Sequence, residues 1–320
     1  MLHITSSSYK SNVFKPYLYF FVFWVKPFDM QDWLLALLII IGVYVFLSVL
    51  LYLFQDYFLF KPEKLPKDFE FDYANQEIEE YNVETRDGAV INGIRFKAQS
   101  PKGVVFYLKG NSKSIKGWGK FAVDFTRHGY DVIMVDYRGF GKSTGRRTQK
   151  AVKRDMQVIY NKIKDNVSEK YIILYGRSLG SGFATKLASM NNPRMLILDA
   201  PYYSLSKVAK KFIPFMPLSL LIKFPMPTYK WLKYVNCPIH IVHGTDDKLI
   251  PYKTSVKLSK IKPELTKLYT VIGGGHKDLN NFESYHKMLS EIIHSRPKKF
   301  DLDGSSINVI HTSKRANAKA

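Results

Sequence analysis

The sequence predicts an α/β protein with a mostly parallel sheet and helices on both faces, preceded by one transmembrane helix. Three observations predict it. Short apolar runs rich in β-branched residues alternate with helix-like segments, which is typical of parallel strands buried on both faces. An uncharged apolar run near the N-terminus is long enough to cross a bilayer. A serine stands between glycines where one of the apolar strands turns into a helix.

The N-terminal part of the chain is dominated by the apolar run Trp33–Phe54, in which Ser48 is the one interruption. The length of this run favours a membrane-spanning helix. A cleaved signal peptide is disfavoured, because the run is too long and no small-x-small cleavage site follows it. We therefore expect a single anchor at residues 33–54.

Residues 1–32 form a separate N-terminal segment. The patch Tyr17–Val25 is apolar but too short to span a bilayer, and the segment carries no domain signal. We expect translation to begin at Met30, so that the anchor enters the membrane almost at once. The alternative is that the aromatic stretch Tyr17–Trp24 lies on the bilayer surface before the anchor.

Residues 55–77 are expected to link the anchor to the folded domain. Tyr57, Phe58 and Phe60 are placed at the membrane interface, where aromatic side chains gather. The stretch Lys61–Lys67 contains two prolines and three lysines and predicts an extended linker rather than a core element. With a start at Met30 the positive charges follow the anchor, and the positive-inside rule then puts the C-terminal domain in the cytoplasm.

The folded domain is expected at residues 78–295, followed by a basic C-terminal tail at residues 296–320. Arg86-Asp87-Gly88 is a hairpin signal between the first two strands, and Gln149–Ile163 is the clearest helix. Strands are expected at Glu80–Thr85, Val90–Ala98, Gly103–Leu108, Asp131–Asp136, Tyr171–Tyr175, Met195–Leu198, Ile239–Val242 and Leu268–Ile272.

Ser178 is the candidate nucleophile. It lies at the apex of Gly176-x-Ser178-x-Gly180, after an apolar strand and before a helix expected at Phe183–Met190. A serine on a strained strand-to-helix turn exposes its hydroxyl, and small neighbours let the strand and the helix pack tightly. The alternative is an ordinary Gly/Ser turn.

A serine hydroxyl needs a base to take its proton and an acid to orient that base. The candidate base is His276, which follows a β-rich run and three glycines. The acid is Asp246 or Asp247, in the turn after a strand; we favour Asp247, and the other is then a turn or N-cap aspartate. His243 precedes the acid in the chain and is set aside, and the other histidines lie in strand, helix or turn patterns.

The order serine, aspartate, histidine is that of the α/β-hydrolases. Residues 78–295 resemble the membrane-anchored, ABHD-like branch of that family, which is often grouped with serine aminopeptidase-like hydrolases. In that family the acid falls three residues after a His-Gly pair, which points to Asp247. The motifs that carry the resemblance are Tyr107–Asn111, Asp136–Gly145, Gly176–Gly180, His243–Asp247 and Gly275–His276.

The oxyanion of the tetrahedral intermediate needs preorganised N–H donors. The expected donors are the backbone N–H groups of Leu179, just after the nucleophile, and of Asn111, in the loop after the third strand. One motif departs from the family pattern, because Lys109 stands where relatives usually have a histidine. We therefore expect a lysine charge beside the site.

The resemblance also implies a cap over the active site after the sixth strand, here at residues 202–235. The stretch Phe212–Pro227 is apolar and broken by prolines, and the whole cap contains six lysines and no acidic residue. This composition suits an apolar acyl substrate beside an anionic bilayer. The alternative is that the apolar residues simply pack the cap onto the sheet.

The formal net charge is +21. No recognition-helix, zinc-finger or RNA-binding motif accompanies it, so we expect an anionic membrane surface rather than a nucleic acid as partner. The alternative is a solvated, lysine-rich surface. Cys237 is the one cysteine, so an intrachain disulfide framework is excluded. No residues around it have the spacing of metal ligands. We expect neither a metal nor an organic cofactor.

Two functions remain open. The first is a membrane-anchored serine hydrolase that cleaves ester, thioester or amide bonds of an apolar acyl substrate through Ser178, His276 and Asp247. The second is a non-catalytic, membrane-tethered scaffold with the same fold. The complete set of candidate catalytic residues favours the first.

Overall fold

The structure is a computed structural model, and it describes residues 29–295. The expectations for residues 1–28 and for the tail at 296–320 lie outside the described residues. The chain divides into two compact units, one ending at Leu47 and the other beginning at Ser48.

Helix α1, Met30–Leu59, begins before the expected span and continues past it. Gln55 and Asp56 extend the helix although they end the apolar run, and Pro62 follows shortly after the helix ends, as the backbone preference before proline favours. Within residues 29–295, α1 is the helix that is long and apolar enough to cross a membrane. Its apolar side chains point in every direction around the helix axis, which suits a lipid environment.

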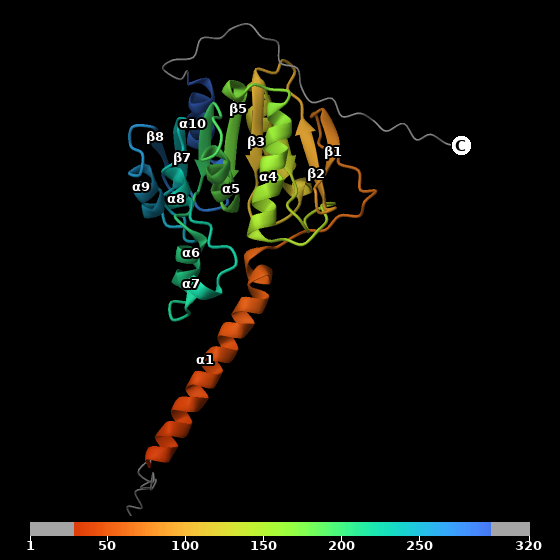
Figure 1. The fold of residues 1–320 in the computed structure, drawn as a ribbon. Coiled ribbons are helices and arrows are strands. Elements are labelled where there is room, and N and C mark those ends of the chain that lie inside the picture. The colour runs from red at the N-terminus through yellow and green to blue at the C-terminus, as the bar shows by residue number, and fades with distance from the viewer. Residues whose placement is uncertain (1–28, 296–320) are drawn as a thin grey trace, which may run out of the picture. The chain divides into compact units, whose positions relative to one another are not determined.

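The centre of the folded unit is one eight-stranded sheet with the order β1-β2-β4-β3-β5-β6-β7-β8 (Figure 1). The pairs β1–β2 and β2–β4 are antiparallel, and every pair from β4–β3 onward is parallel. The strands are β1 Ile78–Glu84, β2 Val90–Phe96, β3 Gly103–Leu108, β4 Tyr130–Val135, β5 Ile172–Arg177, β6 Met195–Asp199, β7 Ile239–Gly244 and β8 Thr266–Val271.

Helices cover both faces of the sheet, so the predicted α/β architecture is confirmed. Side chains alternate along β3: Val104 and Phe106 enter one buried cluster, and Val105 and Tyr107 enter the other. Helices α4, α5, α8 and α9 pack into the first cluster and α2, α3 and α10 into the second. The helices are α2 Ile115–Trp118, α3 Val123–Thr126, α4 Gln149–Lys164, α5 Leu179–Ala188, α6 Leu205–Phe212, α7 Leu218–Leu221, α8 Thr228–Leu232, α9 Lys253–Ser259 and α10 Glu283–His294.

The expected strand positions agree with the sheet to within two residues at each end, and the edge strand β8 is one of those that begin earlier than expected. This strand begins at Thr266, two residues before the apolar run, and ends at Val271. It pairs with β7 alone, and its side chains alternate between buried and less buried positions. A search for continuous apolar runs therefore misses its polar first residues, because an edge strand need not be apolar on both faces.

The expectation that Phe60 lies at the membrane interface is wrong, and the residue after it is also tied to the domain. Phe60 is 2% exposed and packs edge-on against Phe140 and Phe224 in the core, instead of lying at the membrane interface. The next residue, Lys61, donates its backbone N–H to Asn111 O at 2.9 Å. The start of the linker is therefore docked onto the domain by backbone hydrogen bonds. Local sequence patterns carry no sign of this, because the pairing is with Ser112, far along the chain.

Candidate active site

Ser178 forms the turn between β5 and α5. Its backbone has φ +51° and ψ −116°, a conformation that costs a non-glycine residue about 1–3 kcal/mol and is found at functional sites. Helix α5 begins at Leu179, directly after the serine, rather than at the expected Phe183. A Cβ on Gly180 would collide with the carbonyl oxygen of Leu108. The glycine therefore allows the close approach of α5 to β3 that holds the turn.

The structure brings Ser178, His276 and Asp247 together in one chain of hydrogen bonds. Ser178 Oγ lies 2.9 Å from His276 Nε2, and His276 Nδ1 lies 2.7 Å from Asp247 Oδ2. The three residues follow β5, β8 and β7, whose carboxyl ends lie along the same edge of the parallel sheet. With a proton on Nδ1 donated to the carboxylate, Nε2 is free to accept the serine proton.

The two neighbouring aspartates have different surroundings. Asp247 Oδ1 accepts the backbone N–H groups of Leu249 and Ile250 at 2.9 and 2.8 Å, while its Oδ2 faces His276. Asp246 is exposed and its Oδ1 accepts the hydroxyl of Thr245. Burial alone would raise the pKa of the Asp247 carboxyl, but its hydrogen bonds to imidazole and backbone N–H groups outweigh burial and lower that pKa. Asp247 is thus the aspartate in position to orient the base.

His243, which the sequence analysis sets aside, is a second imidazole on the same carboxylate. Its Nε2 lies 3.0 Å from Asp247 Oδ2 and 2.9 Å from the carbonyl oxygen of Ile250. Both neighbours are acceptors, so Nε2 carries the proton, and Nδ1 then accepts the hydroxyl of Ser255 at 2.6 Å. The ring is fully buried and acts as a positioning group for Asp247. In the sequence, the one sign of this role was that His243 stands at the end of an apolar strand, close to the aspartates.

Arg177, the residue before the nucleophile, connects the two loops that carry Ser178 and His276. Its Nη2 donates to the carbonyl oxygen of Lys277 at 3.1 Å, and its Nε lies 3.6 Å from Asp199 Oδ2. Burial is the largest single effect and would lower the pKa of the guanidinium, but Asp199 together with Tyr107, Tyr175 and Tyr285 outweighs it, so the pKa of Arg177 is raised. Arg177 therefore stays charged and ties the histidine loop to the strand ends.

The expected oxyanion donors, Leu179 and Asn111, both line the cavity that Ser178 enters. Leu179 is the first residue of α5, and N–H groups of a first helical turn have no acceptor within the helix. The Asn111 side chain is used elsewhere, because its Nδ2 donates to the carbonyl oxygen of Leu59 at 2.7 Å. It holds the end of α1 against the loop after β3.

Lys109 is fully buried and does not present a free charge to the site. Its Nζ lies 3.3 Å from Asp136 Oδ1, donates to the carbonyl oxygen of Lys113 at 2.9 Å and lies 3.9 Å from the centre of the Phe140 ring. Burial lowers the pKa of Lys109 to about 8, against the opposing effect of Asp136. Burial likewise raises the pKa of Asp136. The expected lysine charge is therefore compensated inside the domain.

The cavity at Ser178 has a volume of about 520 Å³ and is mostly apolar. One wall is the end of α1, with Leu51, Gln55, Phe58 and Leu59. Other lining residues come from the cap helices α6 and α7 and from Leu249 and Ile250, the two residues before Pro251. Such a lining is typical of a site for an apolar ligand with one polar reacting group.

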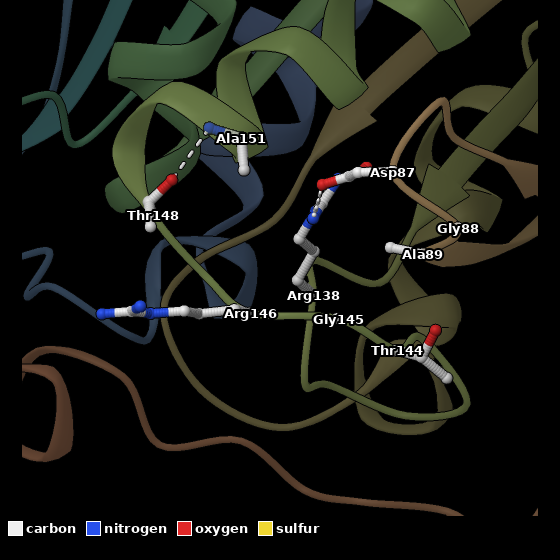
Figure 2. A pocket seen from close by; sticks show the side chains of 9 residues that line it. All are labelled: Asp87, Gly88, Ala89, Arg138, Thr144, Gly145, Arg146, Thr148 and Ala151. Carbon is white, nitrogen blue, oxygen red and sulfur yellow. Dashed lines mark hydrogen bonds and ion pairs between the residues drawn. The ribbon is translucent and has the colours of Figure 1, made fainter.

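A second hollow, of about 420 Å³, shares no lining residue with the first (Figure 2). One of its lining side chains is Arg138, whose guanidinium binds both Asp87 and Asp155. The guanidinium of Arg138 is therefore already paired with carboxylates of the domain itself. Among residues 29–295 the structure shows no group of three or more histidine, cysteine, aspartate or glutamate side chains placed to hold a metal ion.

Comparison with known proteins agrees with the fold described above. A family model described as serine aminopeptidase, S33, matches residues 99–234, which include Ser178 but neither Asp247 nor His276. The solved structure of an esterase from Pyrococcus furiosus superposes with a TM-score of 0.59 at 19% identity, over 73% of this chain and 98% of that one. This likeness shows the fold.

Two curated relatives match at modest identity. An uncharacterised protein of Mycobacterium tuberculosis is 28% identical over 200 residues, 61% of this chain and 71% of that protein. Lysophosphatidylserine lipase ABHD12 of Danio rerio is 27% identical over 204 residues, 56% of this chain and 51% of the lipase. The matched region thus spans about half of the lipase.

The aspartate assignment predicts unequal effects of two neighbouring substitutions. Asp247→Asn should lower kcat for an activated ester by about 10⁴-fold, because an amide cannot hold the imidazole in the tautomer that accepts the serine proton. The matched control Asp246→Asn should stay near the wild type. Steady-state kinetics on the purified protein measure both, and the reverse ranking would move the acid to Asp246.

The buried ion pair predicts an effect on stability. Lys109→Met should destabilise the domain by about 3–5 kcal/mol, because it leaves Asp136 buried without its partner. The double variant Lys109→Met/Asp136→Asn removes both charges and should recover part of that loss. Chemical unfolding in detergent measures the difference, and a wild-type midpoint for Lys109→Met would contradict it.

Proposed function

We propose that this chain, an ABHD-like α/β-hydrolase-fold protein, is a membrane-anchored serine hydrolase. It cleaves ester or thioester bonds of an apolar acyl substrate, with amide hydrolysis as a sub-case of the same chemistry. The single observation that carries the proposal is the hydrogen-bonded chain from Ser178 through His276 to Asp247, which opens into an apolar cavity. A catalytic serine and an acyl site are thus joined in one place.

The reaction proceeds in two balanced halves. In the first, His276 Nε2 takes the Ser178 proton, Oγ attacks the acyl carbonyl carbon, and His276 then gives the proton to the departing alcohol or thiol. In the second, His276 takes a proton from water, the hydroxide attacks the acyl-enzyme, and the proton returns to Ser178 Oγ as the acid leaves. The N–H groups of Leu179 and Asn111 stabilise the oxyanion in both halves.

The substrate class follows from the cavity and from the relatives. An apolar lining of this size accommodates an acyl chain, and a polar head group would extend from the reacting carbonyl toward solvent. The relative from Danio rerio is a lipase for lysophosphatidylserine, a single-chain phospholipid. A single-chain acyl lipid is therefore the proposed substrate class.

The proposed location is a membrane, with α1 as a single-pass anchor. Lys61, Lys64 and Lys67 follow the span, and Lys15 and Lys26 precede it, so the charges are nearly balanced in the full sequence. With a start at Met30, the positive-inside rule favours a cytoplasmic catalytic domain. The six lysines of the cap, without any acidic residue, favour an anionic lipid surface as the partner.

The first test is covalent labelling with a fluorophosphonate probe. Ser178→Ala should abolish labelling and ester turnover while leaving the fold intact, because it removes one hydroxyl. The control Ser189→Ala, at the C-terminal end of α5, should label as the wild type does. Full labelling of Ser178→Ala would refute the nucleophile, and an unlabelled wild-type protein would favour the non-catalytic scaffold.

The second test addresses the acyl cavity. Ala209→Phe adds a ring to the cavity wall and should reduce kcat/KM for long-chain esters far more than for an acetyl ester. Ala74→Phe, at an exposed position outside the cavity lining, is the matched control. Equal losses at all chain lengths would mean that the wall packs the cap and does not contact the acyl chain.

A further inference from the structure

One side chain of α1, Gln55, forms two hydrogen bonds with the backbone of the cap. Gln55 Nε2 donates to the carbonyl oxygen of Leu221 at 2.9 Å, and Gln55 Oε1 accepts the backbone N–H of Lys223 at 2.7 Å. The amide thus pairs with the cap backbone in the way that a neighbouring strand would. Two directional bonds from one side chain fix the height of this part of the cap along the helix.

A second contact lies deeper along the same helix. The hydroxyl of Ser48, the polar interruption of the apolar run, donates to Met216 Sδ at 3.5 Å. Ser48 and Gln55 are seven residues apart, which is about 10 Å along a helix axis at 1.5 Å per residue. The cap segment from Met216 to Lys223 therefore runs beside the last apolar turns of α1.

The polar side chains mark where a bilayer surface would lie. The ammonium group of Lys223 lies 4.7 Å from the centre of the Tyr52 ring, and Gln55 is one turn further along. Tyrosine and lysine side chains prefer the head-group region. With the surface at Tyr52, Ser48 and the adjoining Met216 lie about 6 Å deeper, which is the depth that interfacial elements reach.

The same segment carries large apolar side chains on its outside. Phe212, Phe215 and Leu220 are 61%, 88% and 81% exposed. Phe212 also lines the cavity at Ser178. Large exposed apolar side chains mark contact sites, and lysines stand on both sides of these three.

We propose that residues 212–223 of the cap are a second membrane-contacting element, inserted among the lipid acyl chains of the leaflet beside α1. Lys223 lies at the head groups, and the apolar side chains lie below them. The acyl substrate then passes from the leaflet into the cavity between α1 and the cap without crossing water. This inference rests on the proposed anchoring of α1 in a membrane.

The test places a fluorophore at position 220 of the full chain in vesicles of phosphatidylcholine and phosphatidylserine. Leu220→Cys is labelled with an environment-sensitive dye and quenched with doxyl-labelled lipids. Burial raises the pKa of the Cys237 thiol to about 12, so the native cysteine should not react. The two reference sites are Leu38→Cys, within the span, and Ser100→Cys, which is exposed in the loop between β2 and β3. This loop lies at the end of the parallel strands away from Ser178.

We expect the dye at position 220 to show blue-shifted emission and doxyl quenching, as at position 38, while position 100 shows neither. Quenching at 38 with none at 220 would overturn the inference and leave the anchor intact. No quenching at 38 would overturn the proposed anchoring and the inference with it. A blue shift at 220 without quenching would mean that protein, rather than lipid, covers the segment, and would also overturn it.

A second variant tests the attachment. Gln55→Leu, made in the Leu220→Cys protein, keeps the side-chain size but removes both hydrogen bonds to the cap, and should cause loss of quenching at position 220. Gln157→Leu, on the surface of α4, is the matched control and should leave quenching unchanged. Unchanged quenching in Gln55→Leu would show that Gln55 does not set the depth of the segment.

Discussion

The candidate site depends on the buried carboxylate of Asp247. Each of its oxygens has two hydrogen-bonding partners: backbone N–H groups at Oδ1, and the imidazoles of His243 and His276 at Oδ2. A charge in such a position is stable only while its partners stay in place. This one carboxylate therefore holds the ring of His276, the turn after β7 and the loop after β8 in place. It also sets the direction in which His276 Nε2 faces Ser178.

Much of the architecture was predictable from the sequence, because the signals are local. Apolar runs marked the strands, and Gly180 marked a turn in which α5 approaches the backbone of β3. Ser178 and His276 could be chosen because each follows a strand and stands next to glycine or close to it. The choice between Asp246 and Asp247 was harder, because it depends on which of the two side chains points from the turn toward His276.

Two features that the sequence did not reveal are long-range pairings. Phe60 is apolar like its neighbours, and nothing in the chain says that it enters the core beside Phe140 rather than the membrane interface. Gln55 looked like the polar end of an apolar run, yet its amide binds the backbone of a segment 166 residues away. Such contacts arise from tertiary packing, and hydrophobic periodicity reports only on local secondary structure.

The last turns of α1 are both the end of a hydrophobic helix and one wall of the cavity at Ser178. A water-soluble form of this protein made by deleting the helix would lose Leu51, Gln55, Phe58 and Leu59 from that wall, together with the carbonyl that Asn111 binds. Its cavity would open to solvent on one side. Ligand preferences measured on such a truncated form would describe a cavity that lacks one wall, so they should be measured on the full chain in detergent or lipid.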